Sequence, residues 1–142
     1  MDLQMAFFCD DARETPEGKL DATGIFHDLF APGFPARHDR MVLVIVLDWD
    51  RTDQGRYKLK AELVDPDGST VLTIDGHSDV QPSLPGQPPA RTRLVMPLEQ
   101  AAFPRPGRYH LRVTVKGTRL RGPALYLVEV DSEGATAAEP DR

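Results

Sequence analysis

The stretch Phe103–Lys116, FPRPGRYHLRVTVK, decides the fold class of this chain. Two prolines and Gly107 form a turn, and a strictly alternating run follows it. The apolar members of this run are Tyr109, Leu111, Val113 and Val115, and its polar members are His110, Arg112, Thr114 and Lys116. Because successive side chains of a strand point to opposite faces, the run predicts a strand with one face in a core and one in water. Gly117 and Thr118 allow the chain to reverse into another apolar run ending at Val130. Such a hairpin needs a second sheet to bury its apolar face.

Short apolar runs separated by turn signals continue through the rest of the chain. The 13 prolines and 11 glycines fall mostly between these runs, which is typical of many short strands joined by turns. We expect six further strands, at residues 3–9, 19–30, 40–49, 56–64, 69–75 and 91–98. A loop is expected over Gly76–Ala90, and Glu99–Phe103 could form one helical turn. The pattern predicts an all-β fold, an antiparallel β-sandwich of about eight strands that is immunoglobulin-like or C2-like in outline.

Length and composition set the broad class of the protein. The 142 residues suffice for one domain with a real core, and we expect a sandwich over residues 1–130 followed by a disordered, small and polar tail over 131–142. A net charge of −5 argues against a nucleic-acid partner, which requires a basic face. The single cysteine, Cys9, cannot form an intrachain disulfide, which fits a cytoplasmic location. No apolar run approaches the ~20 residues of a membrane span.

Several short segments resemble a known family. These are Phe8-Cys9-Asp10-Asp11-Ala12, Gly18-Lys19-Leu20, Gly24-Ile25-Phe26 and the late Phe103-Pro104-x-Pro-Gly107-x-Tyr109. Together they resemble a family of small, uncharacterised bacterial proteins of about this length, over roughly residues 3–130. The resemblance implies a single immunoglobulin-like β-sandwich of unknown function, and it implies no catalytic residues.

The run Met41–Leu47, MVLVIVL, departs from the alternation seen elsewhere. One set of its side chains can fill the core, which leaves Val42, Val44 and Val46 on the other face. A continuously apolar strand indicates that its outer face is also covered. We expect these three valines to form a protein interface, most simply in a two-fold homodimer. The alternative is that the chain covers the valines itself, for example with the Gly76–Ala90 loop.

Aspartates gather in the turn after this strand, at Asp48, Asp50 and Asp53. If successive strands are antiparallel, Asp75 and Asp79 lie at the same end of the sandwich. Calcium takes 6–8 oxygen ligands from loops of this kind, so these five aspartates are candidate metal ligands. The alternative is that they are solvated turn residues, because aspartate is a common turn former. The four histidines and Cys9 show no metal-ligand spacing.

No nucleophile, phosphate-binding or metalloprotease motif is present in the sequence. We therefore expect a non-enzymatic protein without a cofactor. The leading hypothesis is a non-catalytic binding or assembly module that acts through protein contacts, with itself or with another protein. The alternative is a ligand- or calcium-binding, C2-like sandwich that uses the acidic loop end around Asp48–Asp53.

Overall fold

The structure is a computed structural model, and it describes residues 1–131 of the chain. All regular structure in this range is β-strand, and the strands form two sheets packed face to face, so the predicted β-sandwich is confirmed. Nine strands are present where about eight were predicted. They are β1 (Asp2–Glu14), β2 (Leu20–Phe26), β3 (Asp28–Ala31), β4 (Ala36–Asp48), β5 (Gly55–Val64), β6 (Thr70–Val80), β7 (Arg91–Phe103), β8 (Gly107–Val115) and β9 (Thr118–Glu129). Most of the segment predicted as a disordered tail, residues 132–142, lies outside the described part of the chain.

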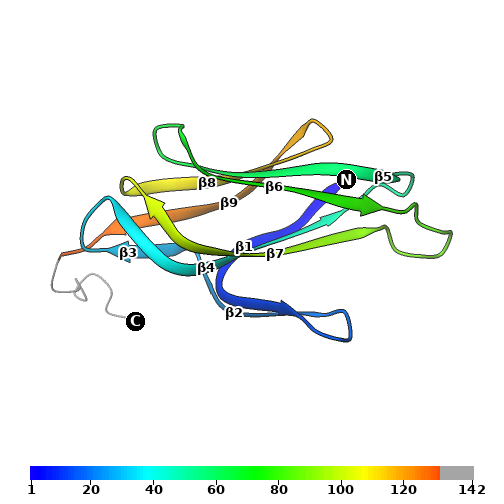
Figure 1. Cartoon of the computed structure of the whole chain (residues 1–142), viewed down its shortest axis with the longest axis horizontal. Coiled ribbons are helices and arrows are strands. Elements are labelled where there is room, and N and C mark those ends of the chain that lie inside the picture. Colours follow the sequence, from blue (N-terminus) through cyan, green and yellow to red (C-terminus); the bar gives the residue numbers. More distant parts are fainter. Residues whose placement is uncertain (132–142) are drawn as a thin grey trace.

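The strands divide between a four-stranded and a five-stranded sheet (Figure 1). The first, sheet A, has the order β2-β1-β4-β7, and the second, sheet B, has the order β3-β9-β8-β5-β6. Every pairing is antiparallel except the one between β3 and β9, which is parallel. The main core lies between the two sheets and includes the fully buried side chains of Trp49, Tyr109 and Phe103.

The alternation in the Phe103–Lys116 stretch corresponds to β8. Tyr109, Leu111 and Val113 are at most 2% exposed and face the core. Lys116 and Gly117 have φ angles of 54° and 73°, as required by a tight two-residue hairpin turn between β8 and β9. At the other end of β8, the Tyr109 hydroxyl donates a hydrogen bond of 2.6 Å to the Arg105 carbonyl, and this bond ties the strand to the preceding turn.

Several predicted strand boundaries were wrong. Strand β1 runs to Glu14 where a strand over 3–9 was expected, and β4 begins at Ala36 rather than at residue 40. In three further cases, pairing with another strand explains the difference. The predicted strand at 19–30 is divided at His27, because β2 pairs with β1 while β3 pairs with β9 in the other sheet. Strand β6 continues through the predicted start of the Gly76–Ala90 loop to Val80, because each of its residues there pairs with β5. The predicted helical turn at Glu99–Phe103 is strand, because β7 stays paired with β4 as far as Phe103.

Strand β4 is buried on both of its faces. Met41, Leu43, Ile45 and Leu47 lie in the main core. Val42, Val44 and Val46 lie in a second, smaller core with Cys9, and their exposed fractions are 0%, 0% and 4%. The predicted interface at these valines is therefore contradicted, because the chain covers them itself. The cover is the β1–β2 hairpin rather than the Gly76–Ala90 loop.

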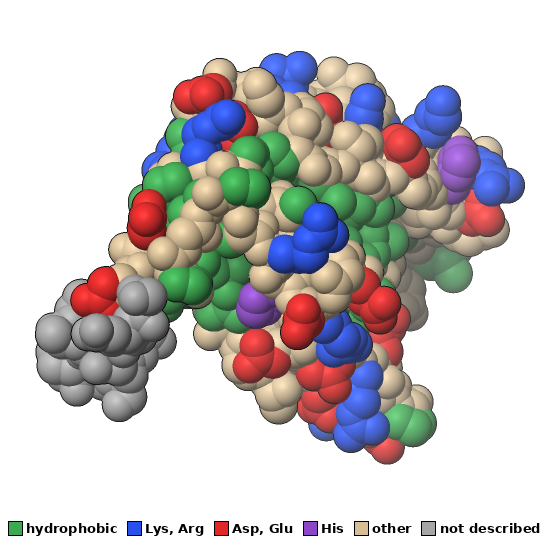
Figure 2. All heavy atoms as spheres, turned by 60° about the vertical axis from the view of Figure 1, so that its left-hand side comes forward, with side chains coloured by type: hydrophobic (Ala, Val, Ile, Leu, Met, Phe, Trp, Pro, Cys, Tyr) green, Lys and Arg blue, Asp and Glu red, His purple; other side chains and the backbone are tan. Residues whose placement is uncertain are grey.

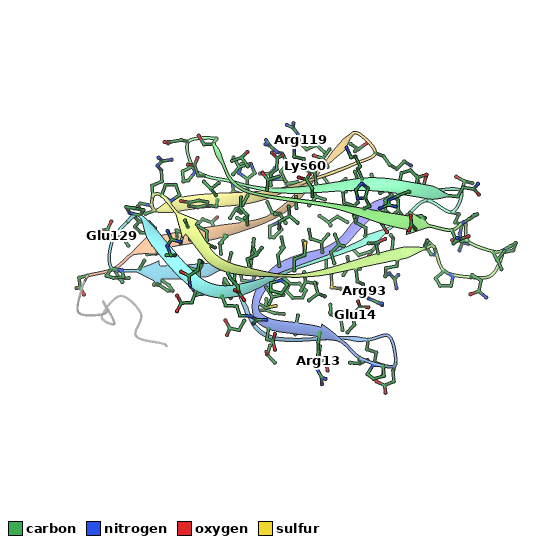
Figure 3. The ribbon with its side chains drawn as sticks, in the orientation of Figure 1. Arg13, Glu14, Lys60, Arg93, Arg119 and Glu129 are labelled. Atoms are coloured by element: carbon green, nitrogen blue, oxygen red, sulfur yellow. The ribbon has the colours of Figure 1, made fainter. Side chains whose placement is uncertain are left out.

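The β1–β2 hairpin reaches the valines because β1 bends. Its first half pairs with β4 as far as Cys9 opposite Val42. Beyond that point the hairpin folds across the outer face of sheet A, and Glu14 near its tip lies 3.7 Å from Arg93 of β7 (Figure 3). Gly24, opposite the bend, has a φ of 64°, and a Cβ there would stand 2.2 Å from the Asp10 carboxylate. The positive φ angle therefore favours glycine at this position.

Candidate functional site

The outer face of sheet B is rich in cations. Because Tyr109, Leu111 and Leu59 point into the core, the side chains that alternate with them along β8 and β5 point to solvent. The cationic side chains on this face are Arg56, Lys58, Lys60, Arg108, Arg112, Arg119 and Arg121, and its carboxylates are Asp28, Glu62, Asp75 and Asp79. We call this surface the basic face. Figure 3 shows Lys60 and Arg119 on the side of sheet B that faces away from sheet A.

The basic face contrasts with the charge of the whole chain. The net charge is −5, so the acidic residues are concentrated elsewhere. The β1–β2 hairpin, the lowest part of the molecule in Figure 2, carries closely spaced acidic and basic side chains. Ion pairs there include Arg13 with Asp21 at 3.4 Å and Arg40 with Asp11 at 3.4 Å. On the basic face, Arg112 and Glu62 form an ion pair of 3.3 Å.

A shallow hollow of about 380 Å³ opens between β8 and β9 within the basic face. It is lined by Arg108, His110, Leu111, Arg112, Arg119, Leu120 and Arg121. The hollow coincides with a β-bulge, since His110 pairs with Ala124 whereas Arg112 pairs with Arg121. We call it the arginine hollow. Gly122 lies in the bulge, and a Cβ there would be 2.9 Å from the Cβ of Leu111, so the close approach of the two strands requires glycine.

The arginine hollow has a strongly positive electrostatic environment. Arg112 and Arg121 are direct cross-strand partners, and like charges in that position destabilise a sheet. Among the described residues, no carboxylate lines the hollow. Burial lowers the pKa of His110 below its usual 6.5, and the neighbouring Arg108, Arg112 and Arg121 lower it further. The imidazole is consequently neutral at pH 7, and the guanidinium groups supply the positive charge.

Apolar side chains border the arginine hollow along β9. Tyr126 is 43% exposed and Val128 is 36% exposed. Tyr126 pairs directly with Arg108 across the strands. Tyrosine and arginine are both enriched at the residues that contribute most binding energy in protein interfaces.

A second hollow, of about 670 Å³, lies on the β5 side of sheet B. Its lining includes Lys58, Lys60, His77 and Lys116, with Asp75 as its carboxylate. Lys60 and Arg119 both flank Thr114 in the register of β5, β8 and β9, so one row of side chains connects the two hollows. The basic face is thus continuous across three strands.

The structure does not bring together the five aspartates predicted as metal ligands. Within residues 1–131, no group of three or more His, Cys, Asp or Glu side chains could hold a metal ion. Asp48 instead accepts hydrogen bonds of 2.5 and 3.2 Å from Arg91. Asp53 accepts one of 2.6 Å from Lys116 and one of 3.0 Å from the Asp50 backbone N–H.

The Asp50 carboxylate pairs with the N-terminal amino group of Met1 and lies 3.8 Å from Lys116. The last two aspartates of the predicted site lie on β6. Asp75 is opposite Lys60 and Asp79 is opposite Arg56 in the register. All five carboxylates therefore pair with or lie opposite cations of this chain, and the described residues 1–131 do not assemble the predicted calcium site at the Asp48–Asp53 loop end.

Sequence reasoning missed the arginine hollow because it treated the polar face of β8 as simply solvated. The signal was present, since Arg108, His110 and Arg112 alternate along one strand of a hairpin and Arg119 and Arg121 alternate along the other. A two-residue turn makes the two rows neighbours. Cations at alternate positions in both arms of a hairpin predict a positive surface on one face.

The fold and the site together define a β-sandwich with one sheet face covered by its own hairpin and the other open and basic. The chain belongs to DUF6941, a family of unknown function, whose model matches residues 4–128. A search of curated proteins found none that matches this chain. In the part of the chain that the structure describes, no helix is long and apolar enough to cross a membrane.

One solved structure with a partial likeness is the Pseudomonas fluorescens alkylpurine DNA glycosylase AlkC bound to DNA containing an abasic site analog. The identity is 13% and the TM-score is 0.40, over 87% of this chain and 30% of that chain. This chain therefore spans less than a third of the length of that protein. At this TM-score the likeness carries no argument about function.

Proposed function

We propose that the chain is a non-catalytic, immunoglobulin-like binding module that docks an acidic segment of another protein on its basic face. The immunoglobulin-like assignment is supported by the order β9-β8-β5 in one sheet and by the parallel pairing of β3 with β9. It is also supported by the bond from the Tyr109 hydroxyl to the Arg105 carbonyl, which has the form of a tyrosine corner. Cys9 is a buried free thiol, in keeping with a cytoplasmic module.

The observation that carries this proposal is the concentration of cations on one open sheet face of an acidic chain. Complementary charge raises the rate of association and suppresses wrong partners. The acidic remainder of the surface would repel an acidic partner and orient it toward the basic face. Self-association through Val42, Val44 and Val46 is not part of the proposal, because these side chains are inside the chain's own second core.

The apolar border of the basic face makes a protein the favoured partner. Tyr126 and Val128 offer contact area that a simple counter-ion would not use. An acidic segment that also carries an apolar side chain could bury this area while its carboxylates pair with the arginines. Such mixed contacts are typical of protein interfaces.

The test uses a fluorescent polyglutamate peptide as the probe and measures its binding by anisotropy at low and moderate salt. Lys60→Glu and Arg119→Glu reverse charges in the row that connects the two hollows, and each should weaken binding about tenfold. The matched control is Arg13→Glu, which makes the same change of charge on the β1–β2 hairpin. Arg13 forms only an exposed ion pair with Asp21, so its reversal should have little effect on folding.

Two results would contradict the proposed docking surface. The first is equal weakening in all three variants, which would indicate a response to net charge alone. The second is binding by the wild type that does not weaken as salt rises, since exposed charge–charge attraction must be screened.

A further inference from the structure

The arginine hollow contains several arginines that have no carboxylate partner among the described residues. Within residues 1–131 no carboxylate lies within ion-pair distance of Arg108, Arg119 or Arg121. All three line one hollow, together with Arg112, whose charge is shared with Glu62. We propose that the arginine hollow binds the phosphoryl group of a phosphorylated side chain in the docked acidic segment. This inference rests on the proposed docking of that segment on the basic face.

The geometry of the hairpin supports a ligand rather than a purely structural role for these arginines. Direct opposition of Arg112 and Arg121 destabilises the β8–β9 pairing. An uncharged pair would avoid this cost without loss of core packing, because both side chains point away from the core. A bound anion between the two strands removes the repulsion, which gives the arrangement a physical reason.

The chemistry of the hollow favours a phosphoryl group over a single carboxylate. A phosphorylated side chain carries a charge of about −1.5 to −2 and three strong acceptor oxygens. The planar guanidinium group offers paired N–H donors that match two of these oxygens at once. Several guanidinium groups from two adjacent strands can therefore serve one phosphoryl group, whereas a carboxylate would leave most of them unpaired. Clusters of arginine are the usual means of recognising phosphorylated motifs.

The volume and position of the hollow fit a side chain rather than a large free ligand. It measures about 380 Å³, near the lower end of the range for small-molecule sites. It is open to solvent beside the exposed Tyr126. A peptide lying along β9 could therefore place a modified side chain in the hollow and an apolar side chain on the tyrosine.

His110 provides an internal reporter of occupancy. The charged groups near it are Arg108 and Arg112 on its own strand, Arg121 on β9, and Glu62 on β5, which is the direct partner of Arg112. A bound phosphoryl group offsets the field of the arginines, so occupancy should raise the pKa of His110. An imidazole that served only as a surface residue would show no change.

The test compares two short acidic peptides that differ only in phosphoserine against serine, and measures their binding to the full chain by calorimetry. We expect the phosphorylated peptide to bind at least about tenfold more tightly. Arg121→Gln and Arg108→Gln should each weaken binding of the phosphorylated peptide far more than binding of the unphosphorylated peptide, and so remove most of this preference. The matched control Arg13→Gln should keep the preference. Circular dichroism verifies that each variant is folded.

The outcomes separate this inference from the proposed function. If both peptides bind equally, the phosphoryl subsite is overturned and the docking surface stands; if neither binds, both are overturned. Inorganic phosphate that binds as tightly as the phosphopeptide would show that the hollow takes a free anion instead. In a competition experiment, a DNA duplex and the serine peptide are each used to displace bound phosphopeptide. If the duplex displaces it at the lower concentration, the basic face binds a nucleic-acid backbone and the phosphopeptide proposal is overturned. A His110 pKa, followed by NMR, that fails to rise with phosphopeptide would also overturn the subsite.

Discussion

Replacing Val44 by alanine tests whether the β1–β2 hairpin is a fixed cover of sheet A. Val44 is 0% exposed and lies in the second core with Cys9, Val42 and Val46. The substitution removes two methyl groups at about 0.8 kcal/mol each and leaves a cavity. We expect a loss of about 2–3 kcal/mol from the free energy of unfolding. This is a large share of the roughly 5–15 kcal/mol typical of a domain.

The assay is urea unfolding followed by circular dichroism, with Ile25→Ala as the matched control. Ile25 is on the same hairpin but is 52% exposed, so its truncation should cost less than about 0.5 kcal/mol. Val44→Asp should not fold, because an unpaired carboxylate in an apolar core costs several kcal/mol. Similar small losses for both alanine variants would refute the reasoning. So would a wild-type dimer that Val44→Asp converts to a folded monomer.

Three further predictions concern the turns at the two ends of the sandwich. Tyr109→Phe leaves the Arg105 carbonyl and N–H without their hydroxyl partner, and the free energy of unfolding from urea titration should fall by about 1–3 kcal/mol. Arg105→Ala should cost a similar amount in the same titration, because Asp65 is 2% exposed and would lose its ion pair. The hydrogen bond from Lys116 lowers the pKa of Asp53 in the folded protein. The ionised carboxylate therefore adds to the free energy of unfolding above the ordinary aspartate pKa of about 3.9, and this stabilisation is lost as pH falls through the lowered folded value. The stability gap between wild type and Asp53→Asn should therefore close in urea titrations below about pH 4, and a constant gap would contradict this assignment.

Most of the fold followed from local patterns, because period-two alternation identifies a half-buried strand wherever it occurs. It located β5 and β8 closely. It failed for β6, where Asp75-Gly76-His77-Ser78-Asp79 has the composition of a loop. Pairing with β5 overrides that composition. The partners of Asp75 and Asp79 in β5 are Lys60 and Arg56, so the evidence for this pairing lies outside the segment whose composition was read.

The continuous apolar run of β4 predicted a covered outer face, and the face is covered. The identity of the cover could not be read from the run, because it depends on the pairing of Cys9 with Val42 and on the bend at Gly24. The arginine hollow was partly predictable, since its two strands are joined by a two-residue turn. The contribution of Lys60 to the basic face was not predictable, because β5 becomes the neighbour of β8 only through the order of strands in the folded sheet.

The outer face of sheet A is covered and that of sheet B is exposed, and this difference limits where a partner can bind. Sheet A is closed by the β1–β2 hairpin, which supplies a second core and a surface of paired charges such as Arg13 with Asp21. Within residues 1–131 nothing covers sheet B in this way, and Arg108, Arg119 and Arg121 form no ion pair with these residues. Unpaired charge on an open sheet attracts an opposite charge at long range. A partner with acidic groups therefore approaches the basic face first, and the side chains around the arginine hollow then decide which partner stays bound.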